Sequence, residues 1–393
     1  MKKILIIDKS FAVGGIQTSL INMVKALKDK YEIDVLMFHN KGTLKKHFPE
    51  DVNIITPKFL MRLHGMGLKE SKSEGKFVYL MRCLTAVFDR IFSNRLSLRF
   101  AMFFEKKLKG YDAVIAFHHE TSINATVSGF YRYAYRKTDA KIKLGWIHYD
   151  PEYISSNDMK NERYMKKMDK IICVSQGTAN KFKTWHPSLA QKIDCCYNFQ
   201  DIDRILRLSQ ETANLKFDKT KFNCFSACRL SDQKAIPRAI EAFAPVLKNN
   251  PDVVWYIAGD GKDRIRCEEL IRENNLQEQI VLLGSIDNPY VYMVQSDLYI
   301  QPSIYEAAPM VYGEAMICKV PIFTTENISS EEMVKPEFGF ICENSLVGMR
   351  KALASLLEDR KKITECKNNY NKFEYSNDVC CKKMEELLQG DSI

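Results

Sequence analysis

Residues 298–314 read Leu298-Tyr-Ile-Gln-Pro-Ser-Ile-Tyr-Glu-Ala-Ala-Pro-Met-Val-Tyr-Gly-Glu314. The apolar residues at the start of this stretch predict a buried β-strand, and the residues from Pro309 onward predict a helix. Proline suits the first helical position, because its missing N–H costs no hydrogen bond there. A strand that runs through a polar loop into a helix is the repeating unit of an open parallel sheet.

The same pattern of short apolar runs and helical stretches recurs along all 393 residues. Strands this apolar, separated by helices, indicate parallel sheets that are covered on both faces. In the first half the runs are Ile4–Ile7, Ile33–Phe38, Val52–Ile55, Ala113–Phe117, Leu144–Ile147 and Ile171–Val174. In the second half they are Cys224–Cys228, Val253–Ala258, Ile280–Leu283, Leu298–Ile300, Val320–Phe323 and Phe338–Cys342.

We therefore predict an α/β fold of two tandem doubly wound, Rossmann-like domains that face a cleft. A chain of 393 residues is too long for one compact core. The predicted domains are 1–199 and 200–372, because a strand signal ends near Tyr197-Asn-Phe-Gln-Asp201. A last helix, within about 373–393, is a candidate to pack back on the first domain.

The composition is that of an ordinary globular protein, with 46% hydrophobic and 27% charged residues. The start, Met1-Lys-Lys-Ile-Leu-Ile-Ile-Asp8, has an apolar part of four residues, too short for a signal peptide, which favours a cytoplasmic protein. The 12 cysteines include no Cys-x2-Cys pair near histidines, so no zinc site or other metal is expected.

The formal net charge of +9 is concentrated in residues 58–109, which hold twelve Lys or Arg and four Asp or Glu. Aromatic residues and methionines lie between these basic residues, as in helices that lie on an anionic membrane surface. The alternative is a pair of ordinary amphipathic helices with a solvated basic face. No recognition motif accompanies the charge, so nucleic acid is not expected as a partner.

Charged residues follow two predicted strands of the second half, where ligands of open α/β sheets bind. Arg229 and Lys234 come after one strand and are suited to neutralise a diphosphate. Glu306 and Glu314 come after the other and can accept hydrogen bonds from sugar hydroxyls. Taken singly, each of these residues is as well explained by a solvated or helix-capping role.

Two more strand ends carry candidate residues in the first half. Gly14 and Gly15 follow the first strand and allow close approach of the backbone to a ligand, although a tight turn explains them equally well. His148 ends another strand and is either a sugar partner or a loop cap. His118 and His119 are expected on opposite faces of their strand and so do not share a metal.

The pair Asp201 and Asp203 resembles a short metal-binding motif but precedes a helical pattern. Aspartate is a common residue at a helix start, so we interpret the pair as a cap.

These motifs together resemble the retaining glycosyltransferases of GT-B fold known as family 4, which include bacterial polysaccharide and glycolipid glycosyltransferases. The resemblance covers nearly the whole chain and is strongest over 225–314. It rests on Arg-Leu with a Lys five residues after the Arg, matched by Arg229 and Lys234, and on Glu-x7-Glu, matched by Glu306 and Glu314. The glycine loop and the strand-end His match as well.

The resemblance implies a cytoplasmic enzyme, possessing no cofactor and no metal, that moves a sugar from a UDP-sugar or another nucleoside-diphosphate sugar. The acceptor would be lipid-linked or a glycan, and the protein would be peripheral on the inner face of the membrane. Arg229 and Lys234 would bind the diphosphate, Glu306 the sugar, Glu314 the ribose, and His148 the hydroxymethyl side of the sugar. The other implied donor-binding residues are Gly14, Gly15, Gly259, Gly284, Ser285, Ala308, Met310 and Val311.

Two residues depart from the family pattern. Ala307 stands where the family has a Gly after the first Glu, and Ala235 where it has a Gly after the Lys. Alternative functions are a non-catalytic partner subunit of the same fold and a nucleotide-sugar epimerase. The four charged residues that a non-catalytic subunit would lose are all present.

Overall fold

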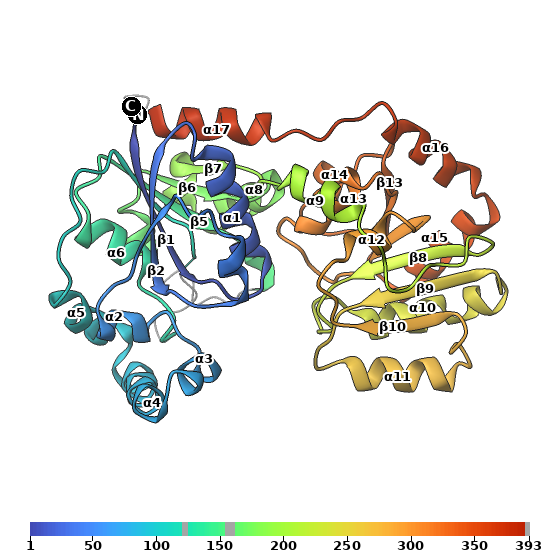
Figure 1. Ribbon diagram of the computed structural model, residues 1–393, viewed down its shortest axis with the longest axis horizontal. Helices are drawn as coiled ribbons and strands as arrows, with labels where there is room; N and C mark the ends of the chain where they lie inside the picture. Colours follow the sequence, from blue (N-terminus) through green and yellow to red (C-terminus); the bar gives the residue numbers. More distant parts are fainter. Residues whose placement is uncertain (120–124, 154–161, 390–393) are drawn as a thin grey trace. The chain divides into compact units, whose positions relative to one another are not determined.

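The computed structural model describes residues 1–119, 125–153 and 162–389 (Figure 1). The chain forms two compact units, which are Met1–Phe199 with Asn377–Ile393, and Gln200–Ser376. We call them unit 1 and unit 2. Each is built on one parallel sheet with helices between successive strands, so the predicted α/β fold of two doubly wound domains is confirmed.

The sheet of unit 1 has seven parallel strands in the order β3-β2-β1-β4-β5-β6-β7. Its central strands are buried on both faces, which explains why they appear in the sequence as continuous apolar runs. The strands are β1 (Lys3–Ser10), β2 (Glu32–His39), β3 (Asn53–Ile55), β4 (Ala113–Ala116), β5 (Ile142–Ile147), β6 (Lys170–Cys173) and β7 (Ile193–Cys195).

Helices connect these strands, and a separate helical segment lies between β3 and β4. The connecting helices are α1 (Gly15–Leu27), α6 (Phe130–Lys137), α7 (Glu162–Met165) and α8 (Gln176–Trp185). The inserted segment contains α2 (Phe59–Leu63), α3 (Leu68–Ser73), α4 (Lys76–Phe92) and α5 (Asn94–Phe103), which Figure 1 shows grouped at one end of unit 1.

The C-terminal helix α17 (Asp378–Gln389) belongs to unit 1, although it follows unit 2 in the sequence. Lys383 pairs with Asp194 of β7 at 2.9 Å, and Lys2 donates to the carbonyl of Leu388 at 2.7 Å. Met384 is fully buried. The C-terminal helix therefore packs on the same unit that contains the N-terminal strand.

The sheet of unit 2 has six parallel strands in the order β10-β9-β8-β11-β12-β13. Cys224, Trp255 and Ile300 point to one face, and Phe225 and Tyr299 point to the other. The strands are β8 (Phe222–Ala227), β9 (Val253–Ala258), β10 (Ile280–Gly284), β11 (Leu298–Gln301), β12 (Ile322–Thr325) and β13 (Gly339–Cys342).

Both faces of this sheet are covered by helices (Figure 1). One face packs against α10 (Ile236–Lys248), α11 (Arg264–Glu273) and α15 (Leu346–Glu358). The other packs against α9 (Ile202–Ser209), α12 (Tyr290–Met293), α13 (Met310–Ile317) and α14 (Ser330–Met333), and α16 (Lys361–Tyr370) ends the unit.

All twelve apolar runs form strands, within three residues at either end. Strand β7 was not predicted. It has three residues, one of them polar, and is too short to form a recognisable apolar run. The helical pattern after Asp201 forms α9, and the Asp201 side chain accepts from the backbone N–H of Arg204 at 3.3 Å. The interpretation of this aspartate as a cap is confirmed.

We predict that Met384→Ala destabilises unit 1 by about 2–4 kcal/mol, because it leaves a cavity beneath α17. The matched change Val379→Ala on the same helix removes a side chain that is mostly exposed, and it should cost less than about 0.5 kcal/mol. Urea unfolding followed by circular dichroism measures both. Equal effects would contradict the packing described for α17.

Candidate active site

The strand order of unit 2 reverses direction between β8 and β11, which are neighbours in the sheet. Ligands of open α/β sheets bind outside the carboxyl ends of the strands at such a switch point. The loop that leaves β8 carries Arg229 and Lys234, and the loop that leaves β11 carries Glu306. The topology therefore brings residues 72 positions apart to one edge of the sheet.

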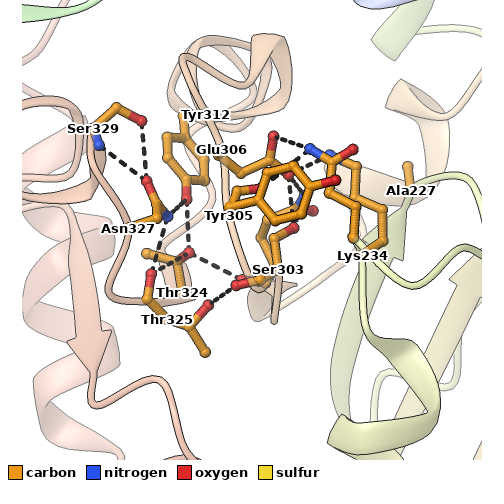
Figure 2. A network of polar contacts seen from close by, with 12 residues as sticks. Ala227, Lys234, Ser303, Tyr305, Glu306, Tyr312, Thr324, Thr325, Asn327 and Ser329 are labelled. Carbon is orange, nitrogen blue, oxygen red and sulfur yellow. Dashed lines mark hydrogen bonds and ion pairs between the residues drawn. The ribbon is translucent and has the colours of Figure 1, made fainter. Parts of the chain in front are cut away.

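Lys234 and Glu306 form a direct ion pair between these two loops (Figure 2). The Glu306 side chain is buried, and the same oxygen, Oε1, also accepts from Ser303 Oγ at 2.7 Å and from Gln301 Nε2 at 3.0 Å. Gln233 Nε2 donates to the other oxygen at 3.4 Å. These donors replace the water that the buried carboxylate has lost.

The loop between β11 and α13 is held in place by further hydrogen bonds (Figure 2). Thr325 Oγ1 donates to the carbonyl of Ser303 at 2.5 Å, and Thr324 Oγ1 donates to the carbonyl of Gln301 at 2.9 Å. The backbone N–H of Ile304 donates to the carbonyl of Gln233 at 2.8 Å. A fully connected buried network of this kind is rigid, so Glu306 is held in one position before any ligand binds.

Gly259 and Gly261 support the loop that carries Arg229. A Cβ on Gly259 would lie 1.8 Å from the carbonyl oxygen of Cys228, and one on Gly261 would lie 2.1 Å from that of Leu230. Gly259 also has a φ of +134° and donates to the carbonyl of Gly284 at 2.7 Å. Close contact between the two backbones therefore requires these glycines, and it places Arg229 with its side chain exposed at the sheet edge.

Ala235 begins helix α10 with φ +50° and ψ +34°, in the left-handed region. This is the position where the resembled family has glycine, and the backbone keeps the conformation that suits glycine. The methyl group thus adds local strain directly beside Lys234.

The start of α13 differs slightly from the prediction. Pro309 is the residue before the helix, with φ −68° and ψ +128°, and Met310 is the first helical residue. The carbonyl of Met310 accepts from Gln200 Nε2 at 2.9 Å, which fixes this end of the helix. Ala308 and Val311 are half-buried beside it, and Ser285 is exposed after β10.

Glu314 lies one turn further along α13 and is half-buried. Burial raises the pKa of its carboxyl to about 7, although Tyr290 donates to it at 3.4 Å and the charge of Arg204 acts in the opposite direction. At neutral pH this group is therefore poised between its neutral and its ionised form.

Unit 1 places its candidate residues at its own switch point, between β1 and β4. Gly14 caps the start of α1 after β1, with extended backbone, and Gly15 is the first residue of the helix. His148 follows β5, and its Nε2 lies 2.9 Å from the carbonyl oxygen of Phe117. A carbonyl only accepts, so Nε2 carries the proton and Nδ1 is left as an acceptor.

Burial lowers the pKa of His148 to about 3, so the ring is neutral at physiological pH. The expectation that His118 and His119 lie on opposite faces of a strand was wrong. Both follow β4, which ends at Ala116, and their rings are stacked with centroids 5.2 Å apart and an angle of 7° between the planes. The alternation of side chains applies only within a strand.

The residues that sequence reasoning missed are those that hold the charged groups. Gln233, Gln301 and Ser303 support Glu306, and Tyr290 contacts Glu314. A signal for Gln301 was present, because it is a buried polar residue at the end of an otherwise apolar strand.

Comparisons with known proteins find similar sequences and similar folds. Residues 209–373 match the model of the family described as glycosyl transferases group 1. The match covers less than half of the chain, so the similarity to this family is that of residues 209–373. Over 178 residues the chain is 28% identical to an uncharacterised glycosyltransferase of Methanocaldococcus jannaschii. The match covers 44% of each chain.

A second relative is the N-acetylgalactosamine-N,N'-diacetylbacillosaminyl-diphospho-undecaprenol 4-alpha-N-acetylgalactosaminyltransferase of Campylobacter jejuni, 29% identical over 205 residues. The match covers 51% of this chain and 54% of the relative, so the chain spans about half the length of the curated relatives it matches. The crystal structure of Anabaena HepE in complex with UDP and glucose aligns over 100% of both chains, with a TM-score of 0.67 and 20% identity. The fold is the GT-B fold.

We predict that Ala235→Gly stabilises unit 2 by about 1 kcal/mol, because glycine removes the cost of the left-handed backbone. The matched change Ala352→Gly, inside α15, should destabilise the protein by about 1 kcal/mol. Chemical denaturation of both variants measures the two effects. The same sign for both would contradict the backbone conformation at Ala235.

Proposed function

We propose that the chain is a retaining glycosyltransferase that uses a nucleoside-diphosphate sugar, with UDP as the nucleotide. The observation that carries this proposal is the buried Lys234–Glu306 pair at the switch point of unit 2, beside the exposed Arg229. Support comes from the family of residues 209–373 and from the UDP in the HepE crystal structure.

The ion pair has a simple role in donor binding. The Lys234 ammonium neutralises Glu306 in the free protein, and a diphosphate with about two negative charges competes for it. When Lys234 turns to the diphosphate, Glu306 Oε1 loses one donor and gains room to accept a hydroxyl of the sugar. Ser303 and Gln301 keep the carboxylate in place during this exchange.

In the proposed reaction, the bond between the anomeric carbon and the diphosphate oxygen breaks. The acceptor oxygen forms its bond to that carbon on the same face, and its proton passes to the leaving diphosphate oxygen. Arg229 and Lys234 stabilise the charge that develops on the diphosphate, so we propose that transfer needs no metal ion. His148 is neutral, and its Nδ1 is available to accept from a hydroxyl.

We propose a lipid-linked or polysaccharide acceptor. Support comes from the Campylobacter relative, whose name specifies a diphospho-undecaprenol acceptor. Identity to that protein extends over 51% of the chain, so the acceptor is assigned by chemical class only.

We expect Glu306→Ala and Arg229→Ala each to lower the transfer rate by at least about 100-fold, because each removes a group that contacts the transferred sugar or its leaving group. The control Arg272→Ala removes an exposed arginine of α11 and should leave the rate unchanged. A panel of UDP-sugars with a polyprenyl diphosphate-linked acceptor, in the presence of EDTA, provides the assay. NMR of the product gives the anomeric configuration.

Thermal shift with UDP separates the proposal from a non-catalytic role. UDP at about 100 times its Kd should stabilise the folded protein by about 2.7 kcal/mol, and Arg229→Ala should weaken its binding at least about tenfold. Binding of UDP without transfer or hydrolysis of any donor would favour a non-catalytic subunit. Absence of UDP binding would contradict the proposed function altogether.

We predict that UDP affinity depends on pH through Glu314. Its pKa of about 7 means that the carboxyl is mostly protonated at pH 6 and mostly ionised at pH 8. If the ionised form accepts from the ribose, affinity should rise about tenfold between these values. The phosphate of UDP titrates nearby, so calorimetry should compare the wild type with Glu314→Gln, which should lose this part of the rise. An identical pH profile would contradict the role of Glu314.

A further inference from the structure

Helix α4 in unit 1 has its polar side inward. Arg82 and Asp89, one heptad apart, are both buried. Arg82 Nε donates to the carbonyl of Met66 at 2.7 Å, and Asp89 accepts from Ser97 of α5. A surface helix ordinarily buries its apolar face and exposes its polar one. These polar contacts hold α4 in the opposite orientation.

The outward side of α4 is a continuous apolar stripe. Its five residues recur at intervals of three and four, so they share one face of the helix. Each is between 55% and 66% exposed. They are Phe77, Leu80, Leu84, Val87 and Ile91. Single exposed apolar residues are common on soluble proteins, but a contiguous stripe of them indicates a surface that binds a partner.

The neighbouring helix α5 packs against α4 and exposes apolar residues as well. Leu96, Phe100 and Phe103 are each more than half exposed. The alternative of ordinary amphipathic helices with a solvated basic face does not fit α4, because its stripe is not buried against the rest of the described chain.

The exposed charges of the segment that carries the stripe all have one sign. In residues 58–109 every exposed charged side chain is basic. The ten are Lys58, Lys69, Lys72, Lys76, Arg90, Arg95, Arg99, Lys106, Lys107 and Lys109. The four acidic residues of the segment are buried or half-buried, and each has a partner.

This charge pattern determines which kind of partner can bind the surface. A second copy docked through the same face would bring basic residues of the two copies together, which is repulsive. A nucleic acid would satisfy the charges but leave the apolar stripe in water. An anionic lipid surface offers acyl chains to the stripe and phosphates to the basic residues.

We propose that α4 and α5 dock unit 1 on an anionic lipid bilayer, with the stripe lying in the interface. Among the described residues, no helix is long and apolar enough to cross a bilayer. At 17 residues, α4 is about 25 Å long and would lie along the surface. The use of this surface to reach a lipid-linked acceptor rests on the proposed function, whereas the binding itself does not.

The experiment is co-sedimentation of the full chain with vesicles, without nucleotide or sugar. We expect partition onto phosphatidylcholine vesicles that contain phosphatidylglycerol to be at least about tenfold stronger than onto phosphatidylcholine alone. Leu84→Glu/Ile91→Glu should lower it at least about tenfold. The control Ile265→Glu/Val379→Glu changes two equally exposed apolar residues elsewhere and should bind as the wild type does.

The basic residues are tested in the same way. Arg95→Glu/Arg99→Glu should weaken binding at least about tenfold, and the matched exposed pair Lys248→Glu/Lys351→Glu should have less than about a twofold effect. Charge-reversal variants that fold poorly would also lose binding, so a second measurement uses a signal that appears only on binding. The indole introduced by Val87→Trp should be quenched by lipids with brominated acyl chains, and that introduced by Val379→Trp should not.

Three results would overturn the proposal. These are no binding of the folded wild type to anionic vesicles, equal loss of binding in the control pairs, or a dimer in solution that Leu84→Glu/Ile91→Glu dissociates. Failure here with a normal response to UDP would leave the proposed function standing. Vesicle binding without any response to UDP would remove the proposed function and leave this inference.

Discussion

The ion pair of Lys234 and Glu306 is the interaction on which the candidate site of unit 2 depends. It joins the loops after β8 and β11, and these strands are neighbours at the switch point of the sheet. A buried carboxylate without a cation would be strongly unfavourable, so the pair also fixes the distance between the two loops. Because Gln301 and Ser303 hold Glu306 independently of Lys234, the lysine can change partner without loss of the carboxylate's position.

The backbone around this ion pair makes close contacts and adopts a left-handed conformation, both of which glycine tolerates best. Gly259 and Gly261 allow two loops to lie against each other at a separation that no side chain would permit. Ala235 adopts a left-handed backbone without being a glycine, directly beside Lys234. Local strain beside Lys234 fits the proposed ligand site, because proteins tolerate local strain where the surrounding structure fixes it.

Periodicity and residue chemistry predicted the sheets well, because strands buried on both faces are continuous apolar runs. They also identified Arg229, Lys234 and Glu306 at strand ends. They did not predict that Lys234 and Glu306 bind each other, since residues 72 positions apart meet only through the order of the strands. The stacking of His118 on His119 was missed for a local reason, because β4 ends at Ala116, before either histidine.

Helix α4 shows where a pattern alone is insufficient. The spacing of its apolar residues gives one face, but spacing does not say whether that face points inward or outward. Arg82 and Asp89 decide the orientation, because a buried arginine and a buried aspartate need partners that only the interior supplies here, the carbonyl of Met66 and the hydroxyl of Ser97. The same rule fixes Glu306 in unit 2. In both units, a buried polar group needs a hydrogen-bond or ion-pair partner. This requirement determines which side chains lie at the surface.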